Sequence, residues 1–203
     1  MGAVHISIMS GKLDGFKSIS TNTLTNQFCI KMNRANEEII CSHCYSHTML
    51  KGYRKNAAPP LQRNSDLLSS RPLTVDELPF MKENYVRFNA HGELINAQHL
   101  ENLVAITLHN PHCNFALWSK RKDIIKKFFS INEKPSNLIV IYSNPKIGTI
   151  IKEPPIYFDR TFNNVLEDEY VDRQNCTGQK CKHCLLCYTH NKVNTIVEKV
   201  KRY

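Results

Sequence analysis

The sequence predicts an α/β fold: a partial, open parallel β/α barrel built as one domain over residues 1–203, with cysteine-rich N-terminal and C-terminal segments. Through the middle of the chain, apolar segments of strand length alternate with amphipathic segments of helix length, as in parallel strands joined by crossover helices. Residues 138–142 are apolar at every position, which is typical of a strand covered on both faces. Six strands at most are recognisable, too few for a closed eight-stranded barrel.

The central elements follow one another in the order β-α-β-α-β. The strands are expected at residues 85–88, 115–118 and 138–142, and the helices at residues 96–109 and 120–129. Leucine and valine side chains recur at helical spacing in the first helix, which Pro111 ends. The second helix is expected to turn Ile124, Ile125, Phe128 and Phe129 inward.

The flanking segments are harder to assign. Further strands are expected at residues 4–9, 28–32 and 156–159, and further helices at residues 46–56 and 182–201. The last of these helices would bury an apolar stripe formed by Leu186, Val193, Ile196, Val200 and Tyr203.

Seven of the eight cysteines fall into two groups, and Cys113 stands alone. The N-terminal cysteine group comprises Cys29, Cys41 and Cys44, the last two spaced C-x2-C. The C-terminal cysteine group comprises Cys176, Cys181, Cys184 and Cys187, spaced C-x4-C-x2-C-x2-C. A C-x2-C pair lets two thiolates reach one metal from a single turn of chain. No secretory signal is visible, so the clustered cysteines indicate metal ligands or redox groups.

The spacing favours an iron–sulfur cluster. The C-terminal run resembles segments that wrap a four-iron, four-sulfur cluster, whereas a zinc site takes four tetrahedral ligands. Seven cysteines fit a four-ligand cluster plus a three-ligand cluster with one open iron, or one four-ligand cluster with cysteines to spare. Zinc alone, and structural thiols or disulfides, are the alternatives. Cys113 is expected to be an inert core thiol, so Cys184→Ser should lower stability more than Cys113→Ser.

Polar residues crowd the expected carboxyl ends of the central strands, where parallel α/β folds form their sites. The candidates for lining a pocket beside the cluster are Asn89, Glu93, Ser119, Lys120 and Arg121. If the protein is an enzyme, an open iron of a three-cysteine site would take a substrate or cofactor.

The chain is basic, with 27 Lys and Arg against 18 Asp and Glu and a net charge of +9. The densest cluster is Lys120, Arg121, Lys122, Lys126 and Lys127. It suits either a phosphate-binding face or the solvated face of an amphipathic helix, and we favour the latter. A third interpretation is local, since lysines and arginines would offset the negative charge of a thiolate-bound cluster.

Two short elements resemble radical S-adenosylmethionine enzymes. The segment from Cys41 to Tyr45, followed by a helix, resembles the end of their cluster loop. Gly92 and Glu93, just after a strand, resemble the Gly-Gly-Glu element that holds the methionine amino group. This resemblance implies that Gly92 and Glu93 bind S-adenosylmethionine. The sequence departs from that pattern, because Cys29 lies twelve residues before Cys41 and His91 replaces the first glycine.

Most of the chain resembles the bacteriophage gene-product-88 family of small cysteine-rich proteins. The resemblance rests on the early cysteines, residues 87–93, residues 115–121, residues 142–144 and the closing cysteine run. It implies a viral protein of the bacterial cytoplasm with an iron–sulfur cluster and a half barrel like that of radical enzymes.

The sequence therefore predicts a phage-encoded iron–sulfur protein with a redox role, either electron transfer or catalysis at an open iron. Its expected partner is a small-molecule substrate or a redox protein. A radical S-adenosylmethionine enzyme and a zinc-stabilised nucleic-acid-binding module are the alternative functions. No membrane partner is expected, because the longest apolar stretch, residues 138–142, is far shorter than the roughly 20 residues that span a bilayer.

Overall fold

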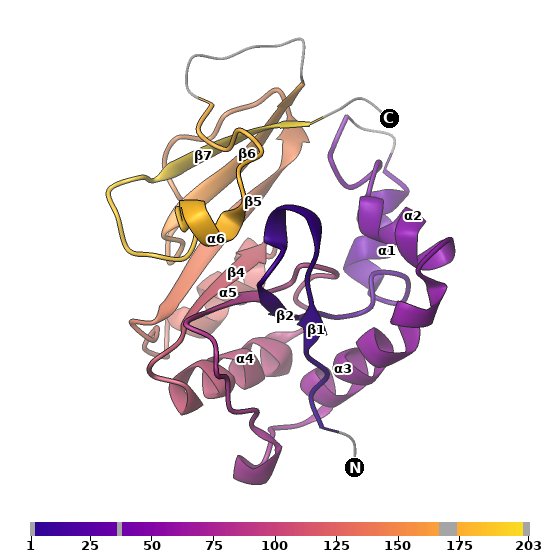
Figure 1. Ribbon diagram of the computed structural model, residues 1–203, viewed down its shortest axis with the longest axis vertical. Helices are drawn as coiled ribbons and strands as arrows, with labels where there is room; N and C mark the ends of the chain where they lie inside the picture. The colour runs from indigo at the N-terminus through magenta and orange to yellow at the C-terminus, as the bar shows by residue number, and fades with distance from the viewer. Residues whose placement is uncertain (1–2, 36–37, 167–173, 201–203) are drawn as a thin grey trace.

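A sheet of seven strands forms the centre of the computed structural model, which describes residues 3–35, 38–166 and 174–200 (Figure 1). The strands lie side by side in chain order: β1 (Ser7–Ile8), β2 (Lys17–Ile19), β3 (Tyr85–Phe88), β4 (Asn114–Ser119), β5 (Leu138–Ile147), β6 (Arg160–Leu166) and β7 (Thr195–Val200). β1 is antiparallel to β2, and every other neighbouring pair is parallel. The predicted α/β class with an open, mostly parallel sheet is therefore confirmed.

Helices lie in every connection between parallel strands except that from β5 to β6. The connections contain α1 (Gln27–Asn33), α2 (Tyr45–Lys51) and α3 (Ala58–Ser70) before β3, α4 (Ala97–His109) before β4, α5 (Lys122–Phe129) before β5, and α6 (Cys181–Cys184) before β7. Three 3-10 turns, η1 (Gly11–Leu13), η2 (Lys55–Ala57) and η3 (Val75–Glu77), complete the set in the described residues. None of the helices in these ranges combines the length and the apolar character needed to cross a bilayer.

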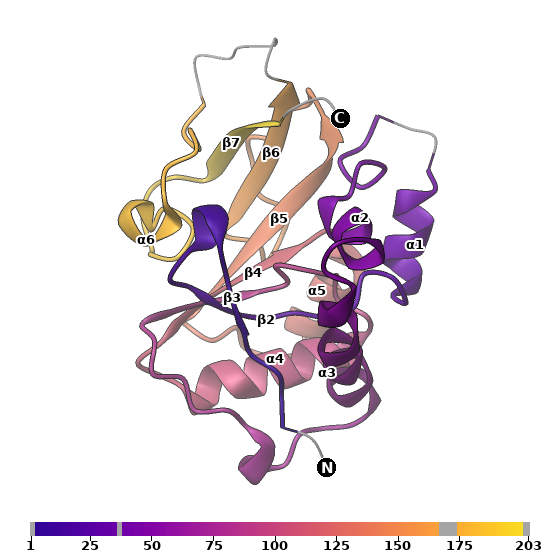
Figure 2. The ribbon, with the colours of Figure 1, turned by 45° about the vertical axis from the view of Figure 1, so that its right-hand side comes forward.

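The two faces of the sheet are covered by different parts of the chain. On one face, Phe115 and Leu117 of β4 pack with the apolar sides of α4 and α5. On the other face, Trp118 of β4 packs with Phe16 and Tyr188, which come from the two ends of the chain. Both views show α6 beside the η1 loop (Figures 1 and 2). The second face is therefore closed by short loops.

The central predictions are confirmed and several flanking ones are wrong. Residues 28–32 are not a strand, because the Asn26 side chain caps α1 by accepting hydrogen bonds from the N–H groups of Phe28 and Cys29. Of the strand expected at residues 4–9, only β1 forms. The segment 156–159 is a turn that precedes β6. β2, β6 and β7 were not predicted and bring the number of strands to seven, and the helix expected at residues 46–56 is divided between α2 and η2.

The predicted C-terminal helix is the largest error. Only α6 is helical in this region, and Ile196 and Val200 belong to β7. Their β-branched side chains suit a strand, and β7 pairs along its whole length with β6. Residue 201 and Tyr203 lie outside the described residues. Cys113, by contrast, is buried in the core as predicted.

Candidate functional site

The carboxyl ends of β2 to β5 meet at one edge of the sheet, because these strands are adjacent and parallel. Asn89 follows β3 directly, with a φ of 57°, in the left-handed region that asparagine tolerates better than most residues. Its side-chain amide donates a hydrogen bond of 3.3 Å to the carbonyl of Trp118. The end of β3 is thereby held against β4.

Gly92 brings the loop after β3 into contact with the end of β2. Its φ is 77°, and a Cβ atom there would lie 2.2 Å from Thr21 Oγ1. The Gly92 N–H donates to Thr23 Oγ1 at 3.1 Å. Glycine is required here both for the backbone conformation and for the close approach.

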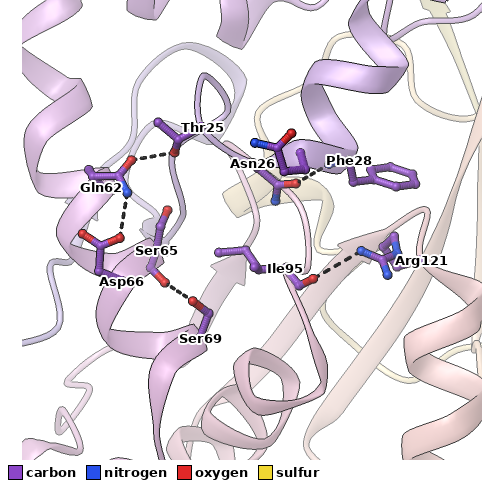
Figure 3. Close-up of a pocket in the computed structure, with 10 residues that line it drawn as sticks. Thr25, Asn26, Phe28, Gln62, Ser65, Asp66, Ser69, Ile95 and Arg121 are labelled. Carbon is purple, nitrogen blue, oxygen red and sulfur yellow. Dashed lines mark hydrogen bonds between the residues drawn. The ribbon is translucent and has the colours of Figure 1, made fainter.

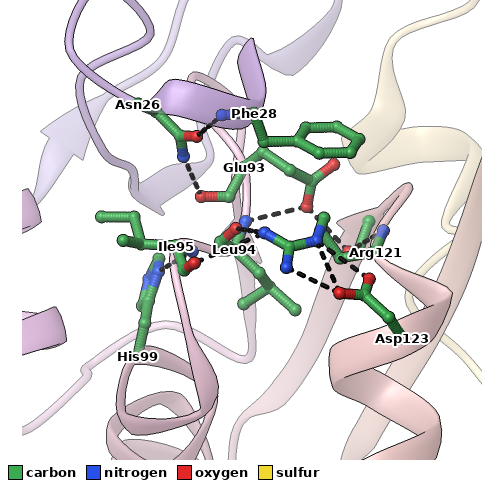
Figure 4. Close-up of polar contacts among 9 residues, drawn as sticks. Asn26, Phe28, Glu93, Leu94, Ile95, His99, Arg121 and Asp123 are labelled. Carbon is green, nitrogen blue, oxygen red and sulfur yellow. Dashed lines mark hydrogen bonds and ion pairs between the residues drawn. The ribbon is translucent and has the colours of Figure 1, made fainter. Parts of the chain in front are cut away.

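The buried carboxylate of Glu93 joins the loop after β3 to the end of β4 (Figure 4). Its Oε1 accepts hydrogen bonds from Ser119 Oγ at 2.7 Å and from the Leu94 N–H at 2.8 Å. Its Oε2 accepts from the Lys120 N–H at 2.8 Å. The backbone carbonyl of Glu93 accepts from the Asn26 amide at 2.9 Å. Because the protein itself engages both carboxylate oxygens, this geometry favours a positioning role for Glu93.

Lys120 and Arg121 follow β4 but serve different neighbours. Lys120 Nζ donates a hydrogen bond of 3.0 Å to Ser143 Oγ on β5. Arg121 pairs with Asp123 at 2.7 Å and donates to the carbonyl of Leu94 at 3.2 Å (Figure 4). Together with Asn89, Gly92, Glu93 and Ser119, Lys120 forms what we call the strand-end site. Arg121 instead stabilises the start of α5.

The N-terminal cysteine group gathers beside Lys120. Cys29 lies on α1, Cys41 on the loop that follows, and Cys44 at the N-cap of α2. Burial alone would lower the pKa of Lys120, but the three thiols and Glu93 lie close enough to raise it. Burial raises the pKa values of Cys29 and Cys41. The fold thus brings three thiols from separate segments into reach of one ammonium group.

The C-terminal cysteine group lies on the second face of the sheet, close to β7. Cys181 and Cys184 are the ends of α6, and Leu185, with a φ of 52°, turns the chain so that Cys187 packs against the cluster around Trp118. Arg160 holds the loop after α6 by donating to the carbonyls of residues 186 and 189.

Cys176 joins this group from the segment before α6. Its backbone forms an isolated parallel β-bridge with Glu198 of β7. Its sulfur accepts a hydrogen bond of 3.4 Å from Lys12 Nζ. Lys12 also pairs with Glu198. Burial raises the pKa of Cys176. A lysine from the N-terminal loop thus holds the first cysteine of the run against the sheet.

The thiols of both groups are free. Across the described ranges, no three cysteine, histidine, aspartate or glutamate side chains form a group that could hold a metal ion. Metal binding in such sites is commonly coupled to local folding, because the ligand set is rarely preformed.

A cavity of about 300 Å³ lies next to the strand-end site (Figure 3). Residues of α1 and α3 form its walls, and Ile95 and Arg121 close one side. Hydrogen bonds from Thr25 to Gln62 at 2.6 Å and from Gln62 to Asp66 at 2.7 Å order its polar wall. Its volume and polar lining suit a small polar molecule.

The basic cluster noted in the sequence is divided by the fold. Lys120 turns to the strand ends and Arg121 pairs with Asp123. Lys122, Lys126 and Lys127 are exposed on α5, whose opposite side carries the buried Ile124, Ile125 and Phe129. The segment is therefore amphipathic, with its lysines on the exposed side of α5, and the choice between a solvated and a phosphate-binding face stays a prediction.

Several site residues were not predicted from the sequence. Thr21 and Thr23 escaped notice because β2, which precedes them, has polar residues and only three positions. Lys12 and Arg87 were missed because the thiols that they approach lie far away in the sequence. The sequence does contain one signal for Thr21 and Thr23, the run of four polar residues Ser20–Thr23 that follows Ile19. The structure buries all four of these residues.

These features define an open, mostly parallel α/β protein with one cysteine group at the strand ends and another on the sheet face. A family model described as gene product 88 matches residues 20–173, and the chain belongs to this family. The matched segment contains the N-terminal cysteine group and ends before Cys176. No curated protein and no solved structure matches the chain significantly.

Proposed function

We propose that this protein is a phage-encoded iron–sulfur protein with a redox role, in which each cysteine group holds a four-iron, four-sulfur cluster. The observation that carries the proposal is the placement of Cys29 on α1, Cys41 on the loop that follows and Cys44 at the N-cap of α2, within electrostatic reach of Lys120 at the carboxyl ends of the strands. In parallel α/β folds this edge is where ligands bind. Three cysteine ligands would leave one iron open to a small molecule.

The surroundings of the N-terminal group suit an anionic metal centre. Lys120 supplies a half-buried positive charge, and its ammonium donates a hydrogen bond to Ser143. Thiol groups lose their protons when they ligate iron, so the bound centre would carry negative charge that Lys120 offsets. The bound cluster would supply one-electron redox chemistry. Lys120 would offset the negative charge of the cluster, and Glu93 would hold the strand ends together.

The C-terminal group suits a closed centre with four ligands. It brings Cys176 from the start of its segment, Cys181 and Cys184 from α6, and Cys187 from the loop that follows. Lys12 and Arg160 lie close to the first and the last of these thiols. Four thiolates leave no open iron, so we assign electron transfer to this centre and substrate binding to the N-terminal one.

The cavity beside α1 is the best candidate for a substrate or for S-adenosylmethionine, because Phe28 and Arg121 on its wall adjoin Cys29 and Lys120. The strand ends would be held in place by the hydrogen bonds of Asn89, Ser119 and Glu93. The hydrogen bonds that already engage the Glu93 carboxylate favour an indirect role in cofactor binding.

We also propose that the sheet is part of a half barrel and that the protein acts in the cytoplasm of the bacterial host. The sequential order of parallel strands from β2 to β7 supports the first point, since barrel sheets have this order. Membership of the gene product 88 family supports a phage protein in a host cell.

Anaerobic reconstitution of two paired variants tests the assignment of the centres. Removing one group with Cys41→Ser/Cys44→Ser, or the other with Cys181→Ser/Cys187→Ser, should each halve the iron and acid-labile sulfide per chain. Cys113→Ser, which alters a buried thiol outside both groups, is the matched control and should keep the full amount. Unchanged iron content in all three variants would refute the proposal.

A further inference from the structure

Arg87 lies on the face of the sheet that carries the C-terminal cysteine group. Its Cζ atom lies 3.9 Å from the centroid of the Trp118 ring, so the guanidinium is packed against the indole. Arg87 forms no ion pair with an acidic side chain in residues 3–35, 38–166 and 174–200. A partly buried positive charge thus stands on this face without a carboxylate to balance it.

The groups around Arg87 that can become anionic include the Tyr188 hydroxyl and two cysteines. Cys181 and Cys187 pack against the cluster that contains Trp118 and Tyr188. The Arg87 guanidinium is stacked on Trp118, so it adjoins the packed cluster to which two of the proposed ligands belong.

Hydrogen-bond donors on the same face are left unused. Arg87 Nε, Trp118 Nε1 and Arg160 Nε are buried and have no hydrogen-bond partner among the described residues. Buried donors without an acceptor are unfavourable, and native proteins contain few of them. Sulfur atoms of a thiolate-bound cluster carry negative charge and accept hydrogen bonds. They would therefore be suitable acceptors for these three donors.

We infer that Arg87 is a positioning residue for the metal–thiolate centre of Cys176, Cys181, Cys184 and Cys187, and that it raises the reduction potential of this centre. The inference rests on the proposed function. Trp118 would hold the guanidinium flat while it faces the ligand sulfurs. A positive charge stabilises the reduced state, in which the centre has gained one electron and become more negative.

The test uses full-length protein with Cys41→Ser/Cys44→Ser, so that only the C-terminal centre is loaded. Dithionite supplies the single electron, and the midpoint potential is followed by electron paramagnetic resonance. Arg87→Met should lower the potential, because the charge is gone. Arg87→Lys keeps a charge without the planar N–H groups and should lower it less. Lys122→Met, on the exposed side of α5, is the matched control and should leave it unchanged.

Each outcome decides the matter. If Arg87→Met fails to fold, as judged by near-ultraviolet circular dichroism, or folds without loading iron, the neutral variant Arg87→Gln takes its place. An unchanged potential in that variant overturns the inference, and a lowered potential supports it. Equal potentials in all folded variants also overturn it, while the iron–sulfur function stands. If the natural protein binds iron only through its N-terminal group, the inference fails together with the assignment of the C-terminal centre, while an iron–sulfur function stands; if it binds no iron, both proposals fail.

Discussion

Thr21 Oγ1 occupies the space in which any side chain larger than glycine at residue 92 would begin. A Cβ atom at Gly92 would lie 2.2 Å from this hydroxyl and 2.7 Å from the Thr21 carbonyl oxygen. The loop that carries Glu93 is thus positioned by backbone contact with the residues after β2. The Glu93 backbone carbonyl in turn accepts a hydrogen bond from Asn26, which caps the helix that carries Cys29.

Gly92→Ala should therefore be strongly destabilising. The substitution combines a φ of 77° with overlap against Thr21, and we expect a loss of about 2–4 kcal/mol in the free energy of unfolding. Gly11→Ala is the matched control, since Gly11 has a φ of 66° and no atom within 4 Å of its Cβ position. It should lose only about 1 kcal/mol. Urea denaturation measures both, and equal losses would contradict the close approach.

Glu93→Gln should weaken the strand-end site. The amide offers one acceptor oxygen where the carboxylate uses two, so the N–H of Lys120 or of Leu94 would lose its partner. A buried donor left without an acceptor costs about 1–3 kcal/mol. Glu101→Gln on the exposed side of α4 should change stability by less than about 0.5 kcal/mol. Thermal melting curves that coincide for both variants would refute this role of Glu93.

Metal loading should reverse the ranking of two cysteine variants. In metal-free protein, Cys113→Ser should be the more destabilising, because Cys113 is fully buried in the core whereas Cys184 is exposed. In loaded protein, Cys184→Ser should be the more destabilising, because the free energy of metal binding stabilises the fold. Melting temperatures measured with and without a chelator show the order. Equal values in loaded protein would contradict the assignment of Cys184 as a ligand.

Stability should fall as the pH falls below about 6.5, in part because of His99. Burial lowers its pKa from 6.5 to about 3, so the unfolded chain takes up a proton that the folded protein does not. This contribution is fully present above pH 6.5 and is lost progressively toward pH 3. It amounts to about 2 kcal/mol between pH 7 and pH 5.

The variant His99→Gln should reduce this pH dependence, because glutamine carries no titratable group and still offers an acceptor for the Ile95 N–H. His109→Gln, at an exposed position of α4, is the control and should keep the dependence of the natural sequence. Urea titrations at pH 7 and pH 5 provide the comparison. Parallel pH profiles for the three proteins would rule out His99 as a source.

The sequence contained enough information for the centre of the sheet. Residues 115–118 of β4 and 138–142 of β5 are buried and apolar at every position, so these segments are readily recognised as strands. β6 was misplaced because Arg160, Thr161 and Asn163 are polar although buried. Asn163 Oδ1, for example, accepts from the Asn144 side chain at 3.1 Å and from the Ile151 N–H at 2.9 Å. Hydrogen bonds of this kind between distant segments satisfy buried polar side chains, and they leave no periodic pattern in the sequence.

The candidate site was predictable in the same uneven way. Asn89, Glu93 and Lys120 follow recognisable strands, so their meeting at one edge could be expected. Which cysteines approach Lys120, and which approach Arg87, depends on the path of the chain around the sheet. The assignment of a single domain over the whole chain stays a prediction.

Metal analysis of protein purified without oxygen tests the central claim most directly. The account predicts a brown protein with a broad absorbance band near roughly 400 nm and about eight irons per chain, four for each cysteine group. A colourless protein with stoichiometric zinc would contradict it. That result would instead favour a zinc-stabilised module, whose nucleic-acid affinity should then depend on Lys122, Lys126 and Lys127.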